Sequence, residues 1–213
     1  MLNTVYLFDS AQAENRPGLS IISDRCTEKR ISYGRLLTLI CLTDCGLDVS
    51  GVNIRKDAYG KPYQDVNPGI HFNLSHSNDV FVCVAGEKPV GIDIEKSKAY
   101  NLDEKKKRFF SEFEWALLNR KNGAADFFEL WTCKESYAKF IGLGMRLPFS
   151  TFSVKPDNEG YVVEDPARGR TSLTTFRYNH NYCMSVCSEQ KINYTIKSVN
   201  TPHLINIFPK SII

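Results

Sequence analysis

Val90-Gly91-Ile92-Asp93-Ile94-Glu95 is the stretch around which the fold of this chain can be worked out. Apolar residues alternate here with glycine or an acidic residue, and this period of two predicts a β-strand. Asp93 and Glu95 then leave the same face of the strand. Two carboxylates held so close raise each other's pKa unless a cation lies between them. Because hard oxygen ligands suit Mg²⁺, the stretch predicts a magnesium site.

A second stretch, residues 131–139 (WTCKESYAK), predicts a helix with one functional face. Its apolar residues recur at steps of three and four, and Gly142 and Gly144 supply the stop. Glu135 and Lys139 are four residues apart and project together, with Lys134 adjacent. We expect Glu135 to be a third metal ligand, and Lys134 and Lys139 to face an anion held by the metal. A phosphate is the anion that this arrangement favours.

The composition limits the classes of protein that this chain can belong to. Its 213 residues, 42% of them hydrophobic, suffice for one core or for two small halves packed together. We expect a cytoplasmic protein without a membrane partner, because no apolar run approaches the roughly 18 residues of a membrane span and no signal peptide is recognised. The seven cysteines are odd in number and indicate no disulfide framework. A net charge of +3 is low for a nucleic-acid binder and suits an acidic protein or a phosphorylated small molecule.

Periodicity along the rest of the chain predicts a mixture of strands and helices. The expected strands are residues 4–8, 70–74, 80–85, 90–95, 151–154, 161–164, 173–178, 182–187 and 192–197. The expected helices are residues 31–47, 103–121 and 127–141, and residues 59–63 form an expected turn that presents Lys61. The order of these elements predicts an α+β fold.

The chain also resembles itself when it is shifted by 102 residues, which superimposes residues 79–95 on 181–197. We therefore expect two similar α+β halves, residues 1–95 and 96–213, related by a pseudo-twofold axis. Asp93 and Glu95 align with a threonine and a lysine, so a single active site is expected at the interface of the halves. Since one chain would complete this site, we expect a monomer.

Five short motifs occur in one order between residues 59 and 155. They are Gly60-Lys61-Pro62, Asn73-Leu74-Ser75-His76-Ser77, Gly91-Ile92-Asp93-Ile94-Glu95, Phe109-Phe110-Ser111 and the helical stretch 131–139. In this order they closely resemble the 4′-phosphopantetheinyl transferases of the larger, surfactin-synthetase-activating type. The resemblance implies an enzyme that transfers the 4′-phosphopantetheine arm of coenzyme A to a serine of an acyl- or peptidyl-carrier protein. Adenosine 3′,5′-bisphosphate is released.

The resemblance also implies roles for individual residues. Asp93, Glu95 and Glu135 would hold Mg²⁺ on the pyrophosphate of coenzyme A, and Lys134 and Lys139 would neutralise phosphate charge. Lys61 and His76 would hold the pyrophosphate or the 3′-phosphate, and Ser75, next to His76 in the Ser75-His76-Ser77 turn, would also hold phosphate oxygens.

Two further positions carry over from the resemblance. Arg35 matches a position that binds the 3′-phosphate in the family. Glu114 matches a carboxylate on the helix that precedes the 131–139 stretch. The base that takes the serine proton is therefore Glu135, acting directly or through a metal-bound water, or else Glu114.

Alternatives remain open from the sequence. Similar acids and lysines serve Mg²⁺-dependent phosphodiester or pyrophosphate hydrolases, which would act on coenzyme A or a nucleotide without an acceptor. A degenerate binding module is a second alternative. The basic run from Lys105 to Arg108 is either a solvated helix face or a landing patch for an acidic, transiently bound carrier protein.

Overall fold

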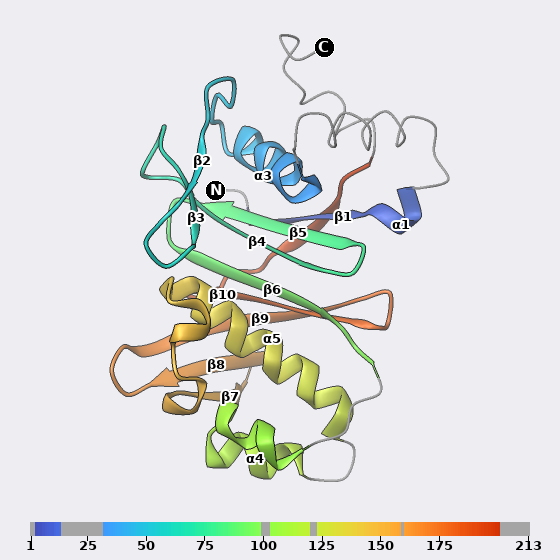
Figure 1. Ribbon diagram of the computed structural model, residues 1–213, viewed down its shortest axis with the longest axis vertical. Helices are drawn as coiled ribbons and strands as arrows, with labels where there is room; N and C mark the ends of the chain where they lie inside the picture. The colour runs from blue at the N-terminus through green and yellow to red at the C-terminus, as the bar shows by residue number, and fades with distance from the viewer. Residues whose placement is uncertain (1–2, 14–31, 99–102, 120–122, 159, 201–213) are drawn as a thin grey trace.

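Two β-sheets form the body of the protein in the computed structural model, which describes residues 3–13, 32–98, 103–119, 123–158 and 160–200 (Figure 1). The first sheet has the strand order β11-β1-β5-β4. Its strands are β1 (Thr4–Asp9), β4 (His71–Ser77), β5 (Val80–Gly86) and β11 (Thr195–Ser198). Helix α3 (Tyr33–Asp44) covers one face of this sheet, and the short α1 (Ser10–Ala13) follows β1.

The second sheet has the order β6-β10-β9-β8-β7. Its strands are β6 (Val90–Lys96), β7 (Ser153–Asp157), β8 (Gly160–Asp165), β9 (Gly169–Tyr178) and β10 (Tyr182–Ser188). Helix α5 (Gly123–Ile141) crosses this sheet (Figure 1). Helix α4 (Glu112–Leu118) contacts α5 and the edge strand β7. The remaining elements are the 3₁₀ helices η1 (Glu104–Phe109), η2 (Gly144–Arg146) and η3 (Phe149–Thr151) and the hairpin strands β2 (Ile54–Lys56) and β3 (Pro62–Gln64). None of the described helices is long and apolar enough to cross a membrane.

The α+β fold expected from the sequence is confirmed, and the two sheets exchange strands. β6 follows the β4–β5 hairpin along the chain but pairs with β10 in the second sheet. β11 follows the β9–β10 hairpin but pairs with β1 in the first sheet. The bounds of β5 and β10 differ by 102 residues, as the predicted duplication requires. The pseudo-twofold axis and the division between residues 95 and 96 stay predictions, and each proposed half lends a strand to the other half's sheet.

Alternation along the strands assigns side chains to three buried clusters. On β5, Val82 faces the space between the two sheets, where Ile92 and Met184 also lie, whereas Cys83 faces α3. The third cluster fills the space between α5 and the second sheet, and Tyr137 is fully buried in it. The apolar run of β5 is therefore buried on both faces, which explains why it is nearly continuous.

Several expected elements differ in the structure. The helix expected over residues 103–121 is divided into η1 and α4, because Ser111 and Glu114 form a capping box that starts a new helix. Residues 31 and 121, at the ends of two expected helices, lie outside the described residues. The sequence did not predict the hairpin β2–β3. Residues 59–61 of the expected turn lie in its loop, where Gly60 has φ +88°, and residues 62 and 63 belong to β3. The turn expected at Ser75-His76-Ser77 is wrong: these residues belong to β4.

Candidate active site at the junction of the two sheets

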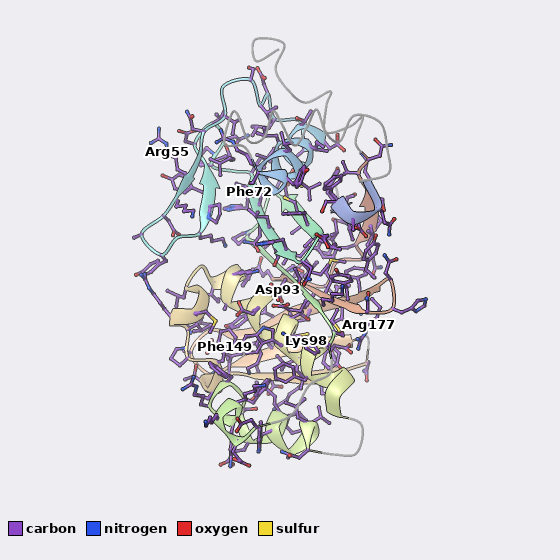
Figure 2. The ribbon with its side chains drawn as sticks, turned by 45° about the vertical axis from the view of Figure 1, so that its right-hand side comes forward. Arg55, Phe72, Asp93, Lys98, Phe149 and Arg177 are labelled. Carbon is purple, nitrogen blue, oxygen red and sulfur yellow. The ribbon has the colours of Figure 1, made fainter. Side chains whose placement is uncertain are left out.

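Helix α5 lies directly on β6, and Gly91 makes this approach possible. A Cβ atom at Gly91 would overlap the carbonyl oxygen of Ser136 and would lie 2.5 Å from the backbone nitrogen of Phe140. The helix backbone can therefore touch the strand only where the strand carries no side chain. The same contact brings Glu135 and Lys139 of α5 beside the acidic residues of β6. Figure 2 shows Asp93 near the middle of the molecule, at the level where the two sheets meet.

Asp93 is the central side chain of this arrangement. Its carboxylate is 6% exposed, and its Oδ1 accepts hydrogen bonds from Lys139 Nζ at 2.6 Å and from Ser75 Oγ at 2.8 Å. Its Oδ2 is buried and has no hydrogen-bond partner. A buried carboxylate oxygen without a donor is costly unless a ligand completes it, so this atom is an open position for a cation or a donor.

Glu95 and Glu135 share the electrostatic environment of Asp93. Burial raises the pKa of Glu135 to about 7, the charge of Asp93 adds to the rise, and Lys139 opposes it. Burial likewise raises the pKa of Glu95, with Asp93 adding to the rise, while a 3.0 Å hydrogen bond from Ser77 Oγ opposes it. The three predicted metal ligands are thus brought into one neighbourhood. Among the described residues, however, no three His, Cys, Asp or Glu side chains are close enough to hold a metal ion as they stand.

Side chains of β4 contact β6 at regular intervals, and the sequence did not predict these contacts. Asn73 Oδ1 accepts from Ile92 N at 2.8 Å, and Ser77 Oγ donates to Glu95 Oε2. Ser75, expected to hold phosphate oxygens, instead accepts from Lys139 Nζ at 2.9 Å and donates to Asp93. The signal that could have revealed this is the period of two in Asn73, Ser75 and Ser77, which is typical of one face of a strand.

His76 lies on the opposite face of β4 from the carboxylates. Its imidazole is exposed and stacks on Phe81, with ring centroids 5.4 Å apart and an interplanar angle of 9°. Phe81 also contacts Tyr33, the first residue of α3. Arg35 lies in the first turn of α3, and its side chain is exposed. Its backbone nitrogen donates to Ser32 Oγ at 3.2 Å. The structure therefore places His76 and Arg35 near the start of α3 and separates them from Asp93.

Lys61 approaches the site from the loop between β2 and β3. Its Nζ donates to the carbonyl oxygen of Phe140 at 3.2 Å, and burial lowers its pKa. A cavity of about 170 Å³ lies beside it. Lys139, Asn73 and Gly142 also line this cavity, so the two lysines face one small space.

Lys134 and Glu114 form a buried ion pair away from this space. Lys134 Nζ lies 2.7 Å from both carboxylate oxygens of Glu114 and 3.1 Å from the carbonyl oxygen of Phe152, and both charged side chains are 0% exposed. Glu114 also accepts from the backbone nitrogens of Ser111 at 2.7 Å and Val154 at 2.6 Å. Residues adjacent on a helix point about 100° apart, so Lys134 faces the core while Glu135 faces β6. Both charged groups are therefore bonded to each other and to backbone atoms in this arrangement, and the roles expected of Lys134 and Glu114 from the sequence stay predictions.

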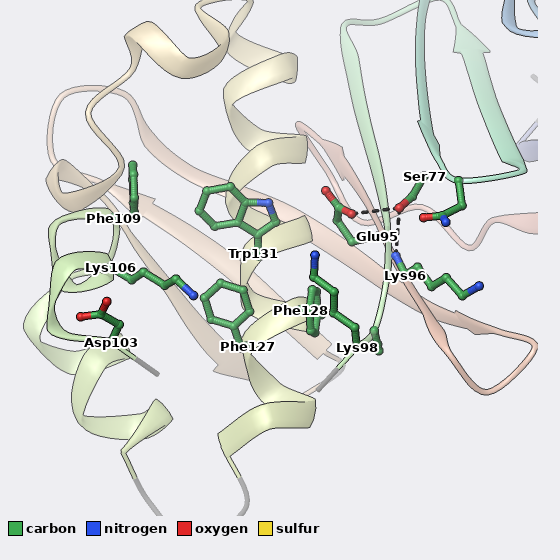
Figure 3. Close-up of a pocket in the computed structure, with 12 residues that line it drawn as sticks. Ser77, Glu95, Lys96, Lys98, Asp103, Lys106, Phe109, Phe127, Phe128 and Trp131 are labelled. Atoms are coloured by element: carbon green, nitrogen blue, oxygen red, sulfur yellow. Dashed lines mark hydrogen bonds between the residues drawn. The ribbon is translucent and has the colours of Figure 1, made fainter. Parts of the chain in front are cut away.

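A cleft of about 930 Å³ opens beside Glu95 (Figure 3). It is bounded by the end of β6, by η1 and by the first turns of α5, and it combines a basic and an aromatic lining. The lining residues are Ser77, Asn78, Glu95, Lys96, Ser97, Lys98, Asp103, Lys106, Phe109, Phe127, Phe128 and Trp131. Of the basic run 105–108, Lys106 lines the cleft and the other three side chains are exposed. The cleft thus has Glu95 and Lys106, one residue of the expected landing patch, in its lining.

Comparison with known proteins gives a consistent set of relatives. Residues 89–187 match the family model described as the 4′-phosphopantetheinyl transferase superfamily. The chain is 39% identical over 195 residues to the 4′-phosphopantetheinyl transferase Sfp of Bacillus subtilis (strain 168), covering 84% of this chain and 87% of that protein. It is 38% identical over 148 residues to a 4′-phosphopantetheinyl transferase of Bacillus subtilis, covering 67% of this chain and 66% of the relative. It is 35% identical over 170 residues to the 4′-phosphopantetheinyl transferase gsp of Aneurinibacillus migulanus, covering 76% and 70%.

Proposed function

Because the chain belongs to the 4′-phosphopantetheinyl transferase superfamily, we propose that the junction of its two sheets is the active site of that transfer. The enzyme moves the 4′-phosphopantetheine arm of coenzyme A to a serine of a carrier protein. The serine oxygen attacks the β-phosphorus, the bond from that phosphorus to the bridging oxygen breaks, and adenosine 3′,5′-bisphosphate leaves. The observation that carries the proposal is the convergence of Asp93, Glu95, Glu135 and Lys139 beside an open cleft.

The residues present fit a divalent cation, which we propose to be Mg²⁺. All three candidate ligands are carboxylates, and Asp93 Oδ2 has no donor. Burial, together with repulsion from the neighbouring carboxylates, raises the pKa of Glu95 and Glu135. When bound, the cation would neutralise charge on the pyrophosphate and orient it. Lys139 now contacts one oxygen of Asp93, so the cation and the phosphates would share that neighbourhood with an ammonium group.

Lysines on two sides of the small cavity support binding of the phosphates. Lys139 and Lys61 line that cavity from α5 and from the β2–β3 loop. Their ammonium groups would neutralise the pyrophosphate, which carries most of the charge that develops during the transfer. Arg35 and His76 lie near the start of α3, and we assign to them the more distant 3′-phosphate.

We assign the acceptance of the serine proton to Glu135 rather than to Glu114. Glu135 lies in one neighbourhood with Asp93, Glu95 and Lys139, where the pyrophosphate would bind. Glu114 is fully buried, and both of its oxygens are already occupied by Lys134 and by backbone donors.

The cleft supports docking of an acyl- or peptidyl-carrier protein. Lys96, Lys98 and Lys106 line it, so an acidic partner would be attracted and would bind transiently.

Strands of both sheets come from one chain, which supports a monomeric enzyme. The six cysteines among the described residues are free thiols, which supports a reducing compartment such as the cytoplasm. The reported relatives are named as transferases, and they lend no support to the hydrolase alternative.

The test is the intact mass of a purified apo carrier protein after incubation with this enzyme, coenzyme A and Mg²⁺. We expect the carrier to gain one phosphopantetheine group, and we expect the gain to be lost in Asp93→Ala and Glu135→Ala and with EDTA. Glu112→Ala is the matched control, because Glu112 is an exposed carboxylate on α4. Full transfer by Asp93→Ala would contradict the proposed site. Consumption of coenzyme A without any gain would indicate a hydrolase.

A further inference from the structure

β4 and β6 are edge strands of different sheets, and they run side by side without a backbone ladder. The first sheet ends at β4 and the second sheet begins at β6. Both strands are fully described, and no backbone hydrogen bond joins them. In Figure 1 they are neighbours at the junction of the sheets. Buried edge groups need partners, so side chains must supply what the ladder does not.

Asn73 and Ser77 supply these partners to the backbone of β6. Asn73 Oδ1 accepts from Ile92 N at 2.8 Å, and Ser77 Oγ accepts from Lys96 N at 3.1 Å. In both pairs the acceptor precedes the donor by 19 residues. The constant offset means that the two strands run parallel here, in a register that these two side chains maintain.

The same hydroxyl of Ser77 also orients a proposed metal ligand. A serine hydroxyl has one proton to donate and lone pairs to accept with. Because the Ser77 oxygen accepts from Lys96 N, its proton is free to be directed to Glu95 Oε2, 3.0 Å away. Glu95 is only half-buried, so without this donor its side chain would be free to turn toward solvent. Ser77 therefore couples the register of the two strands to the orientation of one carboxylate.

We propose that Ser77 is a positioning residue of the active site, which holds the Glu95 carboxylate ready for the divalent cation while Asn73 fixes the strand that carries it. The proposal rests on the proposed function, since it assigns Glu95 to the cation. Partners of metal ligands commonly change metal affinity by 10- to 100-fold when they are removed. Ser77 thus acts on the cation through Glu95 and does not touch it.

The test compares Ser77→Thr with Ser77→Val, two β-branched residues of nearly equal shape that differ by the hydroxyl group. Mn²⁺ is the probe, and its binding to the full chain is titrated by electron paramagnetic resonance with coenzyme A present and carrier protein absent. Thermal unfolding in EDTA confirms that both variants are folded. Ser188→Ala is the control, because Ser188 is a buried serine of β10 whose hydroxyl bonds to Gln190 O at 2.8 Å, at another place in the fold.

We expect Ser77→Val to weaken Mn²⁺ binding by roughly 10-fold. Ser77→Thr and Ser188→Ala should bind as the wild type does. In carrier-modification assays, Ser77→Val should raise the apparent KM for Mg²⁺ and keep kcat at saturating Mg²⁺. Equal Mn²⁺ affinity in Ser77→Val and Ser77→Thr would overturn the positioning role and leave the transferase site standing. Failure of the wild type to bind Mn²⁺ would instead remove the proposed cation site, and the role of Ser77 with it.

Discussion

Replacing Lys134 by methionine should destabilise the fold severely, because the structure places this lysine in the core. The sequence had predicted that it lies in a phosphate site. The side chain has 0% exposure and is paired with Glu114, which also has 0% exposure. Methionine preserves most of the volume of the lysine and removes its charge. The carboxylate of Glu114 would then remain buried without its counter-charge.

The loss of unfolding free energy can be estimated from the interactions that the substitution removes. Lys134 Nζ makes two 2.7 Å bonds to Glu114 and one 3.1 Å bond to Phe152 O, and it lies 4.2 Å from the centroid of the Phe152 ring. Removing one partner of a buried pair costs about 3 to 5 kcal/mol. Total stabilities of domains are about 5 to 15 kcal/mol, so Lys134→Met removes a large share. Combining it with Glu114→Gln should recover most of the loss, because glutamine carries no charge and can still accept from Val154 N.

Urea unfolding measures this directly. Both tryptophans, Trp115 and Trp131, pack in the cluster around α5, so their fluorescence follows the region where the pair lies. With an m-value of about 2 to 3 kcal/mol/M, the midpoint of Lys134→Met should fall by about 1 to 2 M. Lys155→Met is the control, because it breaks an ion pair whose side chains are 40% and 48% exposed and should cost about 1 kcal/mol or less. A Lys134→Met protein with wild-type stability and no transferase activity would refute this reasoning and return Lys134 to the phosphate site.

Three further predictions concern the site and its cleft. Gly91→Ala should reduce the yield of folded protein, because the added Cβ would overlap the backbone of α5. Gly86→Ala is the control: a Cβ at this position contacts no other atom, so this variant should fold normally in the same expression and melting tests. Because the pKa of Glu135 is raised to about 7, the folded state binds the proton more tightly than the unfolded state does, so stability should fall as pH rises from about 4.5 to 7. Melting curves in EDTA should show this fall in the wild type and a smaller one in Glu135→Gln, and an identical slope in both would contradict it. Lys98→Glu with Lys106→Glu should raise the KM for an acidic carrier and leave the KM for coenzyme A unchanged, and an unchanged carrier KM would mean that the partner docks elsewhere.

Local spacing was enough to predict which acidic side chains lie together. A period of two on β6 places Asp93 and Glu95 on one face, and a step of four on α5 places Glu135 beside Lys139. Both relations depend only on backbone geometry that repeats every few residues. They therefore hold in whatever fold surrounds them, and the structure brings these residues into one neighbourhood.

Local spacing does not predict contacts between segments that are distant in the sequence. Nothing in the spacing of Glu114 and Lys134 indicates that a helix pair buries both charges, because a carboxylate 20 residues from an ammonium group has no fixed distance from it. The polar pattern of Asn73 and Ser77 was visible, but its meaning depends on an edge strand from another sheet lying beside it.

The sequence by itself determined the α+β class, the helix and strand that carry the acidic residues, and the family to which the motifs belong. Only the tertiary structure decided that β6 and β11 change sheets, that Lys134 faces the core, and that Ser77 bonds to Glu95. The physical reason is the range of the interactions. Periodicity acts through neighbouring residues of one backbone, whereas strand exchange and buried pairs depend on which surfaces meet after the whole chain has folded.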